Sequence, residues 1–184
     1  MGDAILTLEP LIDAVVEGVR DAGWSLSGLQ KTSSTEFEGE WAGHTTRSAY
    51  LFFHSDARDT ASVEGYLDET DRGLRGTLSL VVDVRPVWEH TSVPDALGRV
   101  AELTTRHLPS GYRTPVTMRL RLPNPSEPPT EAGLEARIKL RIPRAAIEAG
   151  ATSISVLATT TVEAFEALLA DPAADDVLDG IQAP

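Results

Sequence analysis

The first element that the pattern of apolar and polar positions predicts is a helix, which begins near Thr7 and ends at Gly23. Apolar residues recur in this segment at intervals of three and four, as they do on one face of a helix. They are Leu8, Leu11, Ile12, Val15, Val16 and Val19. The opposite face is charged, and we therefore expect this helix to lie on a sheet.

After this helix the pattern changes to an alternation with a period of two, which predicts strands. The predicted strands cover residues 24–29, 35–41, 47–54, 62–68 and 74–85. The third of them contains Tyr50-Leu51-Phe52-Phe53 and is apolar on both faces, which is typical of a central strand. This part of the chain should therefore fold as a meander of three to five strands.

A second helix is predicted from Val93 to His107, because Pro94 and Asp95 suit a first turn and Pro109 lies just beyond the end. Its buried stripe should consist of Leu97, Val100, Ala101, Leu103 and Leu108. Two further alternating segments, 116–122 and 134–142, then predict the strands of a hairpin. Residues 123–133 connect them and are rich in proline, so we expect a flexible loop.

The last third of the chain combines short elements. We expect a helical turn over 143–149, a strand over 154–158 and then a last helix, opened by a capping box at Thr160 and Glu163. The apolar face of that helix should be Val162, Phe165, Leu168 and Leu169. Residues 173–184 are acidic, and form either a docked final turn or a frayed tail.

These elements predict a single α+β domain over residues 1–184, with an antiparallel sheet of about 5–7 strands and three main helices largely on one face. The order is helix, strand meander, helix, strands, helix. This order is similar to the arrangement of secretion-chaperone-like domains. The resemblance rests on element order and acidity, and it implies a protein that works through contacts with other proteins.

Composition narrows the classes of function. The chain has no cysteine, which excludes disulfides, thiolate chemistry and iron–sulfur clusters. Its net charge of −12 opposes binding to nucleic acid and to anionic membranes. The start carries no secretory signal, and no apolar run reaches the roughly 20 residues of a membrane span, so we expect a cytoplasmic protein.

Residues that could carry catalysis are sparse. The histidines His44, His54, His90 and His107 show no metal-ligand spacing, and His54-Ser55-Asp56 are consecutive and cannot converge as a triad. Acidic residues between positions 56 and 71 lack the pattern of a calcium loop. Glycine motifs that bind phosphate are missing too. We expect no catalytic residue, no metal and no cofactor, although a pair of carboxylates brought together by the fold stays open.

Two rows of like charge are the clearest candidate for a binding site. One row is Glu36, Glu38 and Glu40, which should point to solvent from strand 35–41 while Phe37 and Trp41 point inward. The other is a basic face, expected to be at least half exposed, of Arg119, Arg121, Arg137, Lys139 and Arg141. Either these rows are solvated surfaces with weak ion pairs, or they form a bipolar face that docks a partner. A nucleic-acid site is disfavoured, because no aromatic residues interleave with the arginines.

The aromatic residues leave a second choice open. Trp24, Phe37, Trp41, Tyr50, Phe52, Trp88, Tyr112 and Phe165 either fill the core or line a cavity between sheet and helix. A filled core favours a non-enzymatic binding or adaptor domain, with a partner protein or a second copy as its target. A closed apolar pocket favours a domain that binds a small molecule, or an enzyme.

Overall fold

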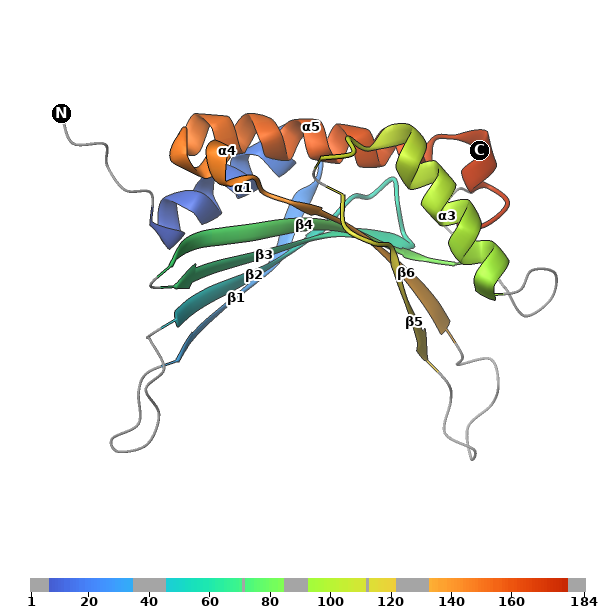
Figure 1. Cartoon of the computed structure of the whole chain (residues 1–184), viewed down its shortest axis with the longest axis horizontal. Coiled ribbons are helices and arrows are strands. Elements are labelled where there is room, and N and C mark those ends of the chain that lie inside the picture. The colour runs from blue at the N-terminus through green and yellow to red at the C-terminus, as the bar shows by residue number, and fades with distance from the viewer. Residues whose placement is uncertain are drawn as a thin grey trace.

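The computed structural model describes residues 7–34, 46–70, 72–84, 93–111, 113–121 and 133–178. The strands are β1 (Ser25–Ser34), β2 (Thr46–His54), β3 (Ala61–Thr70), β4 (Gly73–Asp83), β5 (Thr117–Arg121) and β6 (Gly133–Arg141). The helices are α1 (Leu8–Asp21), α3 (Val93–His107), α4 (Arg144–Glu148) and α5 (Ala151–Leu169), followed by the 3-10 turn η2 (Pro172–Ala174). The strands form one antiparallel sheet in the order β1-β2-β3-β4-β6-β5, and the helices lie together over one face of it (Figure 1). The predicted α+β fold is confirmed.

The core lies between the helices and the sheet, and it is built from the periodicities of the sequence. In α1 the apolar stripe from Leu8 to Val19 is buried, and the helix ends before Gly23, whose φ of 89° requires a glycine. In β4, Leu78, Leu80 and Val82 point inward and are at most 1% exposed. Helix α3 has the predicted bounds, but Leu97 is 36% exposed, and the buried stripe instead runs through Ala96, Val100, Leu103 and Thr104.

The prediction of a strand over residues 154–158 is wrong, because α5 runs continuously from Ala151 to Leu169. Ile154 and Val156 alternate with serines, as in a strand. A helical spacing nevertheless continues through Ile154, Ala158, Val162 and Phe165, and all four are buried. This longer repeat buries more apolar surface on the sheet than a short strand would.

The predicted capping box at the start of the last helix is wrong as well. Gly150 precedes the first turn of α5 with a φ of 93°. The hydroxyl of Thr160, which lies in the middle of the helix, donates to the carbonyl oxygens of Val156 and Leu157 at 3.0 and 3.1 Å. A threonine can therefore sit inside a helix by bonding back to the preceding turn.

The end of the chain is docked up to the last described residue. Val177 and Leu178 are 2% and 0% exposed, and Leu178 makes a β-bridge with Val84. Several predictions fall on parts of the chain outside the described residues: the strand over 35–41, the loop over 123–132 and residues 179–184. Of the aromatic residues expected in the core, Trp24 and Phe165 are fully buried, while Phe37, Trp41, Trp88 and Tyr112 also lie outside the described residues.

Candidate functional site

The face of the sheet turned away from the helices is the candidate site. Strands β1 and β2 at one edge and β5 and β6 at the other slope away from the helical layer, which makes this face concave (Figure 1). Strand pairing places its residues in two adjacent rows. One row runs Phe52, Glu64, Ser79, Lys139, and the other runs Tyr50, Tyr66, Thr77, Arg141. We call the whole of this side of the sheet the concave face; beyond these two rows it also carries Arg137, and next to it Glu135 and Arg119.

Aromatic side chains occupy one half of the concave face. The rings of Tyr50 and Tyr66 lie 4.9 Å apart with a tilt of 48°. Tyr50 is 40% exposed and its neighbour Phe52 is 39% exposed. The expectation that these two residues fill the core or line a cavity between sheet and helix is therefore wrong, since the residues of β2 that face the helices are Ala49, Leu51 and Phe53.

An ion-pair network fixes the middle of the concave face. The guanidinium of Arg137 donates to both carboxylate oxygens of Glu64, at 2.7 and 3.1 Å, and to Glu135 at 2.9 Å. Burial opposes the charged form of Arg137, but the hydrogen bonds to Glu64 and Glu135 outweigh it and raise the pKa of the guanidinium. Both oxygens of Glu64 are thus committed to an arginine, which makes this carboxylate a poor general base.

A second polar network holds the aromatic half in place. Arg75 donates to Asp68 at 2.6 Å, and the hydroxyl of Ser48 donates to the other oxygen of Asp68 at 3.0 Å. The same Ser48 hydroxyl lies 3.4 Å from the hydroxyl of Tyr66. The Tyr66 ring, which packs on Tyr50, is therefore anchored through its polar end.

The basic residues of the concave face differ in what they bind. Arg137 is paired, and its side chain is 24% exposed, which is less than the half exposure expected for the basic face. Three other basic residues form no ion pair with any residue in the described part of the chain. They are Lys139, which is half-buried, and Arg119 and Arg141, which are exposed. The side chain of Arg121 lies outside the described residues, as do Glu36, Glu38 and Glu40, so the pairing of the two charged rows stays a prediction.

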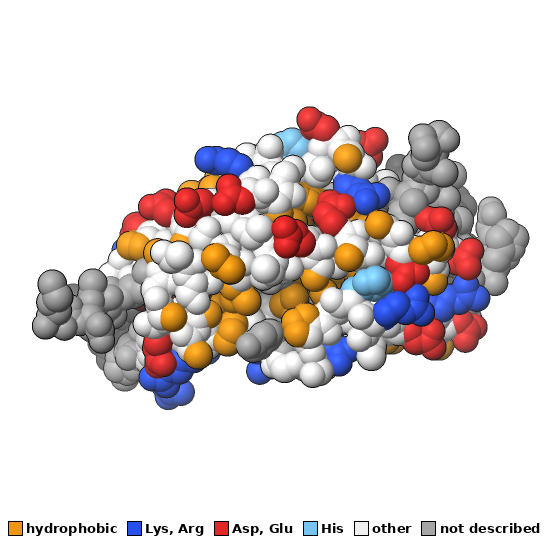
Figure 2. Space-filling model, turned by 90° about the horizontal axis from the view of Figure 1, so that it is seen from above, with side chains coloured by type: hydrophobic (Ala, Val, Ile, Leu, Met, Phe, Trp, Pro, Cys, Tyr) orange, Lys and Arg blue, Asp and Glu red, His pale blue; other side chains and the backbone are white. Residues whose placement is uncertain are grey.

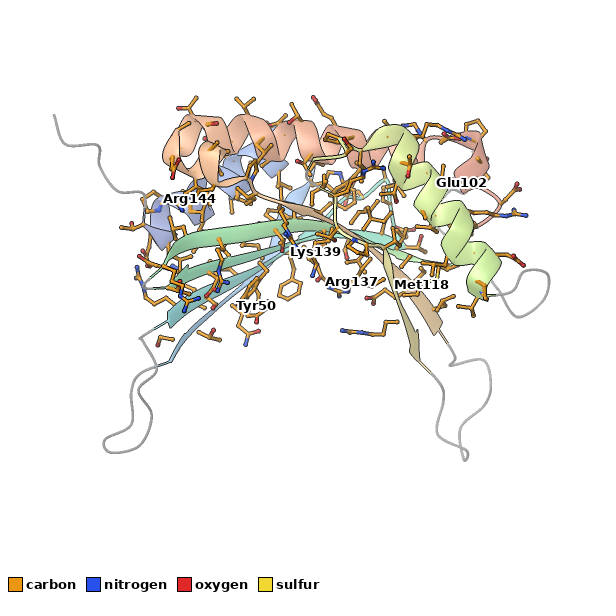
Figure 3. All side chains as sticks on the ribbon, in the orientation of Figure 1. Tyr50, Glu102, Met118, Arg137, Lys139 and Arg144 are labelled. Atoms are coloured by element: carbon orange, nitrogen blue, oxygen red, sulfur yellow. The ribbon has the colours of Figure 1, made fainter. Side chains whose placement is uncertain are left out.

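A shallow hollow of about 230 Å³ joins the aromatic half to the basic half. Its lining includes Tyr50, Phe52, Tyr66, Glu64, Ser79 and Lys139. Figure 3 shows Tyr50, Arg137 and Lys139 on the side of the sheet away from the helices. The hollow therefore offers aromatic side chains, two hydroxyl groups from Thr77 and Ser79, and the ammonium group of Lys139, which has no ion pair within the described residues.

The opposite side of the molecule is acidic. The exposed face of α1 carries Glu9, Asp13, Glu17 and Asp21, and further exposed acids lie on α3, α5 and the C-terminal segment. Figure 2 shows these carboxylates spread over the helical side. On the sheet side, by contrast, Glu64, Asp68, Asp83 and Glu135 face Arg75, Arg119, Arg137, Lys139 and Arg141. Within the described ranges, unpaired negative charge is thus more abundant on the helical side than on the concave face.

The two described histidines, His54 and His107, are not arranged as in a catalytic triad. His54 lies 3.8 Å from Asp56 and both are exposed, while the Ser55 hydroxyl accepts the backbone N–H of Ala57. His107 bonds Asp171, which also binds Arg106 and the backbone of Ala173. His44 and His90 lie outside the described residues. Across the described ranges, no three His, Cys, Asp or Glu side chains gather closely enough to hold a metal ion.

Two other hollows lie on the helical side. One, of about 160 Å³, lies between β6 and α5 and is lined mainly by Pro109, Leu140, Leu157, Thr161 and Ala164. The other is an open groove between α4 and α5, where Val156 is 58% exposed. Neither brings charged side chains together from several elements, as the concave face does.

The concave face can therefore bind a ligand that has both an apolar part and a negative charge. Three carboxylates of this face, Glu64, Asp68 and Glu135, are each paired with an arginine, which makes them poor proton acceptors. Among the described helices, none has the length and apolar character needed to cross a bilayer. No family model matches the chain, and neither the curated proteins nor the solved structures contain a match to it.

Proposed function

We propose that this chain is a non-enzymatic binding or adaptor domain, which recognises a partner protein through the concave face of its sheet. The observation that carries the proposal is an aromatic group, with Tyr50 and Phe52 exposed and Tyr66 half-buried beside them, on the side of the sheet away from the described helices. Tyrosine, phenylalanine and arginine are the residue types enriched in protein interfaces. The Tyr66 ring packs on Tyr50 and its hydroxyl bonds Ser48, so these two side chains lose little conformational entropy when a partner binds.

The alternative is a domain that binds a small molecule or uses a cavity for catalysis, and it has weaker support. Sites for drug-sized ligands usually enclose about 300–1,000 Å³ and bury most of the ligand. The hollow between β6 and α5 measures about 160 Å³ and the hollow of the concave face about 230 Å³. The groove between α4 and α5 reaches about 360 Å³, but it is wide open to solvent and has no charged side chain in its lining. An open, shallow hollow suits the side chains of a protein segment better.

The experiment compares three baits that present the domain to an extract of its source organism. The first is the parent, the second carries Tyr50→Ser with Phe52→Ser, and the third carries Val156→Ser on α5, where the valine is 58% exposed. We expect the parent and the Val156→Ser control to retain the same proteins, and the double variant to lose them at least tenfold by quantitative mass spectrometry. Equal retention by all three baits would refute the proposal.

A further inference from the structure

Lys139 is the cation that lines the hollow of the concave face without an ion pair to any residue that the structure describes. It lies in one row with Glu64, with only Ser79 of β4 between them. Both oxygens of Glu64, however, bind the guanidinium of Arg137. An ammonium group that lines a hollow in a chain of net charge −12, and that has no ion pair with any described residue, is a site for an anion from outside.

The distance between this ammonium and the aromatic group restricts the ligand. Phe52 on β2 and Lys139 on β6 belong to the same row and are three strand spacings apart, which is about 14 Å. Tyr66 on β3 is one strand closer but lies in the next row, at about 12 Å. An extended peptide covers this span in roughly three to four residues.

We propose that the segment recognised by the concave face is an acidic–apolar peptide. An aromatic or aliphatic side chain packs on Tyr50, Phe52 and Tyr66. A carboxylate about three to four residues away binds the ammonium of Lys139, with Arg141 beside it in the next row. This inference rests on the proposed function, and it specifies the chemistry of the partner.

The charge distribution favours this partner over other segments. Of the exposed carboxylates in the described ranges, most lie on the helical side and repel an acidic segment, so that such a segment reaches the domain from the sheet side. A basic segment would be drawn to the helical side instead. The acidic residue of the peptide therefore determines both which partners bind and which face of the domain they approach.

The test begins with selection of displayed random 12-residue peptides on the immobilised domain. We expect enrichment of peptides in which Asp or Glu stands three or four residues from Phe, Tyr, Trp or Leu. The dissociation constants of one selected peptide and of its Asn/Gln counterpart are then measured on the parent and on Lys139→Gln. The acidic peptide should bind about tenfold more weakly to Lys139→Gln, and its neutral counterpart should bind both proteins equally.

Two further variants separate the inference from the function on which it rests. Arg144→Gln removes an exposed cation of the helical side and should leave the dissociation constant unchanged. Tyr50→Ala should weaken both peptides. If selected peptides need Tyr50 but not an acid or Lys139, the acidic–apolar inference is wrong while the binding face stands. If no selected peptide depends on Tyr50, both proposals are wrong.

Discussion

Gly18 of α1 lies directly against the backbone carbonyl of Ser155 in α5. A Cβ atom on Gly18 would come within 2.1 Å of that carbonyl oxygen and within 2.8 Å of the Cβ of Ala158. The hydroxyl of Thr159 donates to the carbonyl oxygen of Gly18 at 3.0 Å, so the two helices are also joined at this point. Because backbone is the obstacle, no change of rotamer can make room for a side chain here.

The first prediction follows from this contact. Gly18→Ala should lower the free energy of unfolding by about 1–3 kcal/mol or more, since α1 must move away from α5. Gly98→Ala in α3 is the matched control, because nothing lies within 4 Å of a Cβ placed there. That substitution should raise the free energy of unfolding by up to about 1 kcal/mol, as alanine favours a helix over glycine. Urea denaturation measures both, and equal effects at the two glycines would contradict the contact.

Elements with long, regular periodicity were predictable from the sequence. The stripe of α1 repeats over three turns, and β4 alternates over Leu78, Leu80, Val82 and Val84, so each pattern admits one structure. Helix α3 is bounded by prolines on both sides. The segment at the start of α5 was ambiguous, because a strand of five residues and one turn of a buried helix can share the same apolar positions.

The candidate site was only partly predictable. Strand 47–54 is apolar on both faces, and the sequence alone does not say which face the helices cover. The tyrosines could have indicated the solvent-facing side, because the hydroxyl at the tip of the ring favours contact with water. Tyr50 and Tyr66 do lie on that side. Arg137 and Glu64 are 73 residues apart in the sequence, and their strands, β6 and β3, are not neighbours in the sheet. This ion pair could not be predicted without the strand order of the folded sheet.

Trp24 supplies a second prediction. Its ring is 1% exposed and its indole N–H donates to Glu166 at 2.9 Å, while Arg58 holds the other oxygen of that carboxylate at 3.0 Å. Glu166→Ala leaves the indole N–H without an acceptor and should cost about 1–3 kcal/mol of unfolding free energy. Glu166→Gln keeps an acceptor oxygen and should cost less. Thermal melts followed by tryptophan fluorescence compare the two, and the prediction fails if alanine and glutamine cost the same.

The docked C-terminal segment gives a third prediction. Leu178 is fully buried beside Val84, and Leu178→Ala should lower the free energy of unfolding by about 2–5 kcal/mol through lost burial and the cavity left behind. Val156→Ala, at an exposed position of α5, should change it by less than about 0.5 kcal/mol. The midpoints of urea denaturation measure both effects. If both variants resemble the parent, the C-terminal segment does not contribute to stability and the prediction is wrong.

The last prediction concerns pH. The carboxylate of Asp171 accepts hydrogen bonds from His107 at 2.7 Å, from the backbone N–H of Ala173 at 2.9 Å and from Arg106 at 2.7 Å. These contacts hold the pKa of Asp171 well below its usual range. A carboxylate with a depressed pKa stabilises the fold fully above its unfolded pKa of about 4, and this contribution is lost as the pH falls from there through the folded pKa.

Asp171→Asn should therefore be less stable than the parent at neutral pH, and the difference in unfolding free energy should shrink as the pH is lowered below about 4. Asp175→Asn is the matched control, because Asp175 is exposed and its side chain makes no ion pair with a described residue. That variant should differ from the parent by less than about 0.5 kcal/mol at every pH. Urea midpoints measured at intervals from pH 7 to pH 3 give both curves. A difference between parent and Asp171→Asn that stays constant across this range would mean that Asp171 does not hold its charge through these three contacts.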